Sequence, residues 1–584
     1  MKFGSLPSSL LLLCLCSLAS AASVDEWRRR SIYQIMTDRF AADDGSANSA
    51  VPGSAPACQS VAGAYCGGTW QGIIQNLDYI QGMNFDAIWI SPVVGQLQQL
   101  TGDGSSYAGY WQQDLYALND KFGSADDLRQ LISELHDRNM FLMMDVVPNH
   151  MAYAGQRSSI DYSVLSPFDD KKYFHPYCAM DYSGDNITAL EKCWLGSEYV
   201  PLPDLKTEDD GVRDMLGQWI HGMVANYSVD GLRIDAGANV EPDFFTGFVK
   251  SAGVFSTAEV YMSNASEACE YQDTVGSILN YPLFWTLTDA FMPDGDLNNL
   301  ADMMNEQKLV CKDTTALATF SENHDVPRFA NHTRDLSLAQ NVAASVIMYD
   351  GIPVVYQGQE QHFTGGVEPF TNREALWQTR DGFNVFAPIY QLLATLNTFR
   401  RHVMSKDTGY VTTKSSVVQK DQHTLVLRKG GSGQPPVVTV LNNLGADAPD
   451  TVVSVTDHGY GQSTALMDVV GCAKFNVDSS GALNVGIQRG LPRVLYPADA
   501  LKDSTLCNTG GNRFKGDSVV MTSIYTTTIG GRAMPTTATA TIPTEAATTT
   551  ASNGHGHKHG SAISRPIPPI YHLLLIFLGV LCLV

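Results

Sequence analysis

The segment Gly231–Val240, GLRIDAGANV, places Arg233 and Asp235 two residues apart in a short strand-like run. An aspartate next to a fixed guanidinium is typical of a catalytic carboxylate, because the cation favours the ionised form. Other polar side chains follow apolar runs elsewhere in the chain: Asp145, Asn149, His150, Glu259, His324 and Asp325. Burying several such groups is costly unless they serve a site. Together they indicate a catalytic site.

Eight short apolar runs precede or contain these polar residues, and helical patterns such as Ala125–Asn139 and Asp214–Tyr227 lie between them. Strands that alternate with helices predict a parallel (β/α)8 barrel, an α/β fold of the TIM-barrel type. The carboxyl ends of its strands meet on one face, so the polar residues are expected to converge there. The predicted strands are Ser31–Thr37, Asp86–Ser91, Phe141–Val147, Gly231–Asp235, Thr257–Tyr261, Ser277–Asn280, Leu317–Ser321 and Pro353–Gln357.

The spacing of these elements divides the folded part of the chain. Residues 22–149 and 210–400 form the predicted barrel, and the long irregular segment 150–209, which follows the third strand, is expected to be a small inserted domain. Residues 401–510 change to alternating strands and predict a C-terminal antiparallel β-sandwich domain.

The two ends of the chain have the composition of targeting signals. Residues 1–21 combine Lys2, an apolar run and Ala19-Ser-Ala21, which predicts a secretory signal peptide. Residues 511–552 form a Ser/Thr-rich stalk, and residues 553–584 have the layout of a removable glycosylphosphatidylinositol (GPI) signal, with attachment expected at Asn553. We therefore expect a secreted monomer that is held at the plasma membrane or cell wall.

The net charge is −22, from 38 Lys and Arg against 60 Asp and Glu, which argues against a nucleic-acid partner. Eight cysteines lie outside the removable ends, and an even number in a secreted protein indicates disulfides of open connectivity: Cys58, Cys66, Cys178, Cys193, Cys269, Cys311, Cys472 and Cys507. Four sequons predict N-glycans, at Asn186, Asn226, Asn264 and Asn331.

Five blocks in order resemble the motifs of the α-amylase family, glycoside hydrolase family 13: DVVPNH from Asp145, LPDL from Leu202, GLRID from Gly231, AEV from Ala258 and ENHDVPRF from Glu322. The blocks GYWQQD from Gly109 and DGIPVVYQGQEQH from Asp350 resemble secreted fungal members. The resemblance runs from about Trp27 to Cys507 and implies an enzyme that acts on α-1,4-glucans or maltooligosaccharides.

The resemblance implies a role for each polar residue. Asp235 would be the nucleophile, Glu259 the general acid/base and Asp325 the carboxylate that stabilises the transition state. Retaining glycosidases need one ionised and one protonated carboxyl, held close together. The resemblance also implies substrate contacts from Arg233, His150, His324, Tyr110, Trp111, Arg373 and Asn239.

The family resemblance also implies Ca²⁺ as a cofactor, bound by Asn149, Glu191, Asp204 and the main-chain carbonyl of Asn239, which are oxygen donors of the kind that calcium prefers. It implies four disulfides between neighbouring cysteines: Cys58–Cys66, Cys178–Cys193, Cys269–Cys311 and Cys472–Cys507.

The chain departs from the family pattern at Ala238-Asn239, where related hydrolases carry Lys-His, and at Ala108, where they carry His. Loss of such hydrogen bonds is expected to weaken plain hydrolysis. Together with the anchor signal, this change resembles fungal membrane-anchored proteins associated with 4-α-glucan transfer and cell-wall α-glucan. We therefore expect a retaining enzyme with substantial 4-α-glucanotransferase character. A plain α-amylase is the first alternative, and a non-catalytic carbohydrate-binding surface protein is the second.

Overall fold

The computed structural model describes residues 22–43, 63–181, 186–367, 370–378, 382–431 and 433–507. All of them belong to one compact unit, Met1–Asn512. The expected signal peptide, stalk, GPI signal with Asn553, and Cys58 lie outside the described residues. No helix in the described part of the chain is long and apolar enough to cross a membrane.

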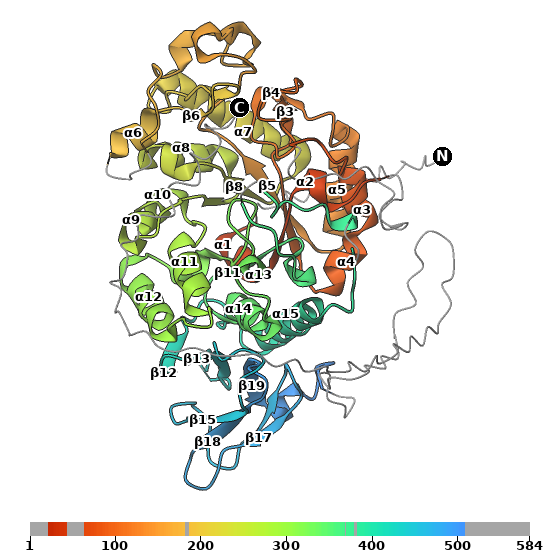
Figure 1. Ribbon diagram of the computed structural model, residues 1–584, viewed down its shortest axis with the longest axis vertical. Coiled ribbons are helices and arrows are strands. Elements are labelled where there is room, and N and C mark those ends of the chain that lie inside the picture. The colour runs from red at the N-terminus through yellow and green to blue at the C-terminus, as the bar shows by residue number, and fades with distance from the viewer. Residues whose placement is uncertain are drawn as a thin grey trace, which may run out of the picture. The chain divides into compact units, whose positions relative to one another are not determined.

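A parallel sheet of seven strands forms the centre, in the order β10-β11-β1-β2-β5-β8-β9 (Figure 1). Single parallel bridges from Ala258 to Ile278 and from Leu279 to Ala318 join its two outer strands. The predicted strand Ser277–Asn280 is therefore present as bridges only, because Asn280 already caps the helix that begins at Tyr281. The (β/α)8 prediction is confirmed. The strands are β1 Ile32–Ile35, β2 Ala87–Ile90, β5 Phe141–Val146, β8 Gly231–Ile234, β9 Phe255–Ala258, β10 Ala318–Thr319 and β11 Ile352–Tyr356.

Helices connect the strands, and α5 (Ala125–Asp137) shows why the sequence forms them. Ser124 and Asp127 make a reciprocal capping box at its start, and its leucine and isoleucine side chains recur at helical spacing and are buried. The other α-helices are α1 Val24–Arg28, α2 Thr37–Phe40, α3 Trp70–Gln75, α4 Leu77–Gly82, α6 Ile187–Lys192, α7 Asp210–Tyr227, α8 Pro242–Ala252, α9 Ala265–Glu270, α10 Gln272–Val275, α11 Tyr281–Ala290, α12 Leu297–Val310, α13 Phe329–His332, α14 Leu336–Met348 and α15 Pro388–Lys406.

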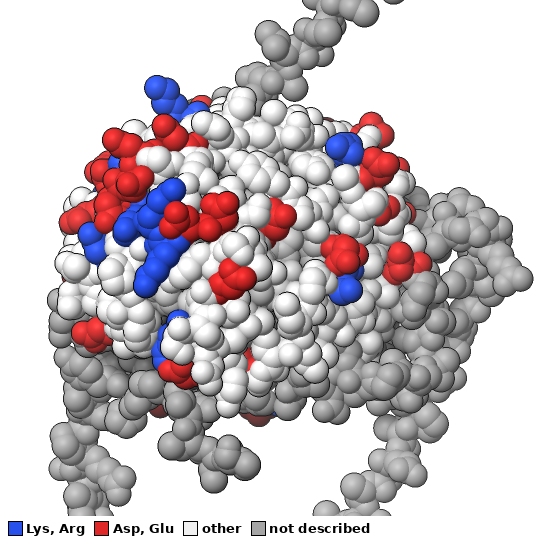
Figure 2. Space-filling view, turned by 90° about the horizontal axis from the view of Figure 1, so that it is seen from above, with Lys and Arg blue, Asp and Glu red and all other residues white. Residues whose placement is uncertain are grey.

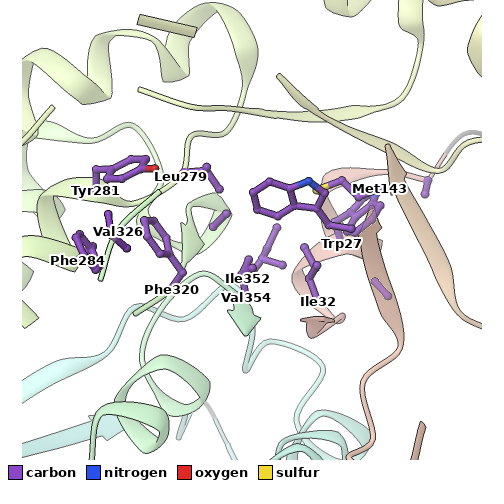
Figure 3. Close-up of a cluster of buried hydrophobic side chains, with 14 residues drawn as sticks. Trp27, Ile32, Met143, Leu279, Tyr281, Phe284, Phe320, Val326, Ile352 and Val354 are labelled. Carbon is purple, nitrogen blue, oxygen red and sulfur yellow. The ribbon is translucent and has the colours of Figure 1, made fainter. Parts of the chain in front are cut away.

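Trp27 on α1 is a central part of the buried core (Figure 3). Its indole nitrogen donates to the carbonyl of Asp230 at 3.1 Å, and its ring stacks on Phe255 with centroids 5.4 Å apart. A Cβ at Gly231 would lie 2.6 Å from the indole. Only glycine therefore leaves room for Trp27 at the start of β8, the strand that leads to Arg233 and Asp235.

The segment between β5 and α7 carries α6, the short strands β6 (Leu195–Gly196) and β7 (Pro201–Leu202), and the Cys178–Cys193 disulfide. A second hairpin, β3 (Val94–Gln96) and β4 (Gln112–Leu118), lies after β2. The apolar cluster of Leu97, Ala152, Val200 and Leu202 joins this hairpin to the inserted segment.

The C-terminal part is antiparallel, as predicted. Six strands pair in the order β12-β13-β14-β19-β16-β17, and β15 pairs with β18. Valine, leucine and isoleucine side chains from both sheets share one core. The bounds are β12 Ser416–Lys420, β13 Thr424–Lys429, β14 Val437–Asn442, β15 Thr451–Val455, β16 Ala465–Asp468, β17 Lys474–Asn476, β18 Leu483–Ile487 and β19 Arg493–Pro497.

The disulfides Cys269–Cys311 and Cys472–Cys507 also form as the family resemblance implied. Cys66 is disulfide-bonded, while its expected partner Cys58 falls outside the described part of the chain.

Candidate active site

Arg233 is the centre of the site. It is fully buried, and its Nη1 donates to Asp235 Oδ1 at 2.7 Å and to both oxygens of Asp145 at 3.1 Å. Its Nη2 lies 3.0 Å from Glu259 Oε2. One guanidinium thus contacts three carboxylates: Asp145 lies in β5, and Asp235 and Glu259 directly follow β8 and β9. These three strands are neighbours in the sheet. The predicted pair of Asp235 and Glu259 is brought together.

The turn after Asp235 ties β8 to β9. Ala236 has a positive φ of 51°, and its main-chain NH donates to Glu259 Oε2 at 3.0 Å. Ala238 NH donates to the carbonyl of Glu259 at 3.1 Å. These bonds place the two carboxylates through backbone geometry as well as through Arg233.

Tyr281 supports Glu259 from the other side. Its hydroxyl donates to Glu259 Oε1 at 3.2 Å and accepts from Asn323 Nδ2 at 2.9 Å. Glu259 therefore has a partner on each oxygen, and the chain of contacts continues to Asn323, two residues before Asp325.

Asp325 has a separate set of partners. Arg373 Nη2 donates to its Oδ1 at 3.2 Å, and His324 Nε2 lies 3.0 Å from its Oδ2. Gln34 Nε2 lies 3.0 Å from His324 Nδ1, an arrangement in which Gln34 donates and the imidazole keeps its proton on Nε2. The His324 ring stacks on Tyr110, with centroids 5.2 Å apart and planes 4° apart.

The remaining predicted sugar contacts divide into two groups. The Tyr110 hydroxyl donates to Asp145 at 2.9 Å, and the carbonyl of Tyr110 contacts His150 Nε2 at 3.1 Å. Both residues are thus linked to the catalytic group, which is the set of Arg233, Asp145, Asp235 and Glu259 with the residues bonded to them. Trp111 instead packs in the apolar cluster that joins the β3–β4 hairpin to the inserted segment. The Asn239 amide donates to the carbonyl of Leu190 on α6 at 3.0 Å.

Burial dominates the protonation of the site. It raises the pKa of Asp235 well above its ordinary value; Arg233 opposes this shift, and the charges of Glu259 and Asp145 add to it. Burial likewise lowers the pKa of His324 well below its ordinary range, with Arg373 and Arg233 adding to the effect. His324 is therefore a neutral hydrogen-bonding group.

Three of the predicted calcium ligands lie together: Asn149, Asp204 and the carbonyl of Asn239. The amide end of Asn149 lies 3.0 Å from the carbonyl oxygen of Asn239 and 3.3 Å from Asp204 Oδ1. The hydrogen bonds favour the Asn149 nitrogen at that position, where it donates to both oxygens. With the amide turned over, Asn149 would complete a set of amide, carbonyl and carboxylate oxygens, which is the donor chemistry that fits Ca²⁺. Glu191 lies on α6 beside Leu190. In the described ranges, no three His, Cys, Asp or Glu side chains form a metal-binding group.

Sequence reasoning missed four residues that support the site. Gln34 interrupts the apolar strand Ile32–Ile35, so a signal was present. Trp89 donates to Asp145 at 3.0 Å, but a tryptophan in an apolar strand carries no sign of this role. Tyr281 and Asn323 likewise became visible only in three dimensions, because Tyr281 is distant in sequence from its partner Glu259, and Asn323 from its partner Tyr281.

Comparison with known proteins agrees with this geometry. The model of the α-amylase catalytic domain matches residues 34–413, and that of α-amylase domain C matches residues 417–515. Alpha-amylase 2 of Schwanniomyces occidentalis is 42% identical over 84% of this chain and 94% of its own. The α-amylase of Saccharomycopsis fibuligera is also 42% identical, over 82% of this chain and 94% of its own.

Among solved structures, an α-amylase from Malbranchea cinnamomea matches with a TM-score of 0.79 and 47% identity, over 83% of this chain and all of that one. The chain belongs to the α-amylase family of glycoside hydrolases.

Proposed function

We propose that this protein is an α-amylase that hydrolyses α-1,4-glucosidic bonds with retention of configuration. The observation that carries the proposal is the shared contact of Arg233 with Asp235 and Glu259, next to an independently held Asp325. Two adjacent carboxyl groups suit a double displacement, in which one attacks the sugar and the other transfers the proton.

In this mechanism Asp235 attacks the anomeric carbon while Glu259 transfers a proton to the departing glucosidic oxygen. A covalent glycosyl ester forms on Asp235, and Glu259 then takes a proton from the water that releases it. Asp325 stabilises the positive charge that develops on the sugar ring, and neutral His324 donates hydrogen bonds without adding a competing cation.

Transfer to a second glucan, the main expectation from the sequence, is the second candidate. The relatives from Schwanniomyces occidentalis and Saccharomycopsis fibuligera are named α-amylases, which favours hydrolysis. The surroundings of Glu259 support transfer. The small residue Ala238 lies against the main chain of Glu259. The Tyr261 ring is 46% exposed and lies near Glu259 and Asp325; burial, and then the charges of Asp325 and Glu259, raise the pKa of Tyr261. A sugar acceptor can replace water where such a ring is available for stacking.

Product analysis separates the two functions. The mature protein is incubated with maltoheptaose, and products are measured by chain length, new reducing ends and anomeric configuration. Shorter products with one reducing end for each bond cleaved and α-configuration support a retaining α-amylase, whereas products longer than the substrate support transfer. An Asp235→Asn variant is expected to lose at least about 10⁴-fold of the rate. Unchanged activity in this variant, or β-configured products, would overturn the proposed mechanism.

We also propose calcium binding by Asn149, Asp204 and the carbonyl of Asn239, with Glu191 as a further ligand; the support is the oxygen set around Asn149. The ion would link the inserted segment to the barrel. Secretion of a monomer, N-glycosylation and GPI anchoring at the cell surface remain proposals that rest on the sequence patterns.

A further inference from the structure

A cavity of about 530 Å³ lies outside the catalytic group, between the loop after β3 and the inserted segment. This volume is within the roughly 300–1,000 Å³ range of small-molecule sites. Three separate stretches of the chain form its walls: Gln99 to Gly102, Ala154 to Gln156, and Glu198 with Tyr199.

Tyr199 offers one open aromatic face to this cavity. A Cβ at Gly102 would lie 2.7 to 2.9 Å from three atoms of the Tyr199 ring, so one ring face covers the backbone of Gly102. The side chain is nevertheless 61% exposed. Leu100, at 76% exposed, adds apolar surface on the same wall.

The local backbone holds this ring in place. Ser197 Oγ accepts from the main-chain NH of Tyr199 at 2.9 Å, and it donates to Asp103 in the opposing loop. The carbonyl of Tyr199 accepts from Gly155 NH at 3.1 Å. All three walls are thus joined through Tyr199 and its neighbours, so the surface is formed before any ligand binds.

The chemistry of the walls fits a neutral polyol. An aromatic face stacks on the C–H face of a sugar, and the amides of Gln99 and Gln156 can bond its hydroxyls. Arg157 pairs with Glu198, so the cavity has no unpaired cation among its described neighbours to attract an anion. Figure 2 shows the charges on the face seen from above in Figure 1, where most acidic and basic side chains gather toward two sides and few lie near the centre.

The cavity wall and the catalytic region are linked by packed side chains. Ala154, in the wall, packs in the same apolar cluster as Trp111, which directly follows Tyr110 of the catalytic group.

We propose that this cavity is a second α-glucan-binding site, with Tyr199 as its stacking platform. The inference rests on the proposed function only for the class of polymer. It adds that the enzyme holds a part of the chain away from the bond that it cleaves, which increases activity on polymers relative to short oligosaccharides.

The test is a Tyr199→Ala variant with a matched control, Tyr116→Ala, since Tyr116 on β4 is 63% exposed and lies outside the cavity walls. Binding of soluble amylose is measured in an Asp235→Asn background, and the rate on amylose is compared with that on maltotetraose in the active protein. We expect Tyr199→Ala to weaken amylose binding about three- to tenfold. Its rate on maltotetraose should stay unchanged, and the control should match the parent in both assays.

Equal losses on polymer and tetrasaccharide, or amylose binding unchanged by Tyr199→Ala, would overturn the second site. Neither result would affect the proposed hydrolysis, because that reaction is measured on short substrates. If Asp235→Asn loses all activity but still binds amylose, the second site is supported, because amylose binding then does not depend on cleavage of the bond.

Discussion

At the scale of residues, two buried arginines each form ion pairs with several carboxylates. Arg233 contacts three carboxylates, and Arg328 contacts Glu322 and Glu374 in the same way farther along the chain. Both arginines are fully buried, so each cation compensates for several acids that are buried or largely buried. This arrangement makes the stability of the protein depend on pH.

Glu322 provides the pH prediction. Burial raises its pKa to about 7, against the opposing charge of Arg328. The unfolded chain releases this proton near pH 4.3. Between about pH 4.3 and 7 the folded state holds a proton that the unfolded state lacks, so the contribution of Glu322 to stability falls as pH rises, by at most about 1.4 kcal/mol per pH unit.

A Glu322→Gln variant lacks this titration, so its difference in stability from the parent should become more favourable as pH rises through that window. Chemical denaturation at several pH values measures this, with the exposed Glu306→Gln on α12 as the control. A difference that is constant with pH would contradict the raised pKa.

At the scale of elements, the sequence predicted the parallel strands well because their apolar runs are bounded by polar residues and glycine. It overestimated Ser277–Asn280, since the competing helix start at Asn280 cannot be weighed from a short apolar run. The supports of the site were harder to predict. Tyr281 is an ordinary first helical residue until the fold brings it to Glu259.

A substitution in the turn after β8 is expected to disturb the packing of β8 against β9. A Cβ at Gly237 would lie 2.9 Å from both the Ala258 side chain and the carbonyl oxygen of Glu259. Gly237→Ala should therefore push β8 and β9 apart, cost about 1–3 kcal/mol of stability and lower kcat at least about tenfold. Denaturation and steady-state kinetics measure these effects. Gly247→Ala on α8, where nothing lies within 4 Å, should leave kcat unchanged; equal kcat in both variants would contradict the argument.

At the scale of the whole molecule, the C-terminal strands are tied to the barrel by a buried ion pair. Lys429 on β13 donates to Asp350 at 2.9 Å and to the carbonyl of Tyr349 at 3.1 Å. Ser415 donates to the same aspartate through its NH and its hydroxyl, both at 2.8 Å. Asp350 directly precedes the glycine that leads into β11, so this contact reaches the barrel sheet itself.

Removing the cation from this pair is expected to destabilise the protein strongly. Lys429→Met leaves Asp350 buried without its partner, at a cost of about 3–5 kcal/mol. Lys420→Met on β12 of the same sheet removes a partially exposed pair with Asp302 on α12, and should cost about 1 kcal/mol or less. Thermal denaturation of both variants gives the comparison, and similar losses would show that burial of the Lys429 pair has no special effect.

The position of β1 between β11 and β2 has a consequence for biosynthesis. As the chain emerges, Tyr33 soon finds its partner Ile88, but its other partner, Val355, is made much later. Until then one edge of the first strand has open hydrogen-bonding groups, the kind of surface on which chains aggregate. Arg400 on α15, which donates to the carbonyls of Arg29 and Arg30 at 3.2 Å, arrives later still. The second edge of β1 therefore stays unpaired until almost the entire barrel has been synthesised.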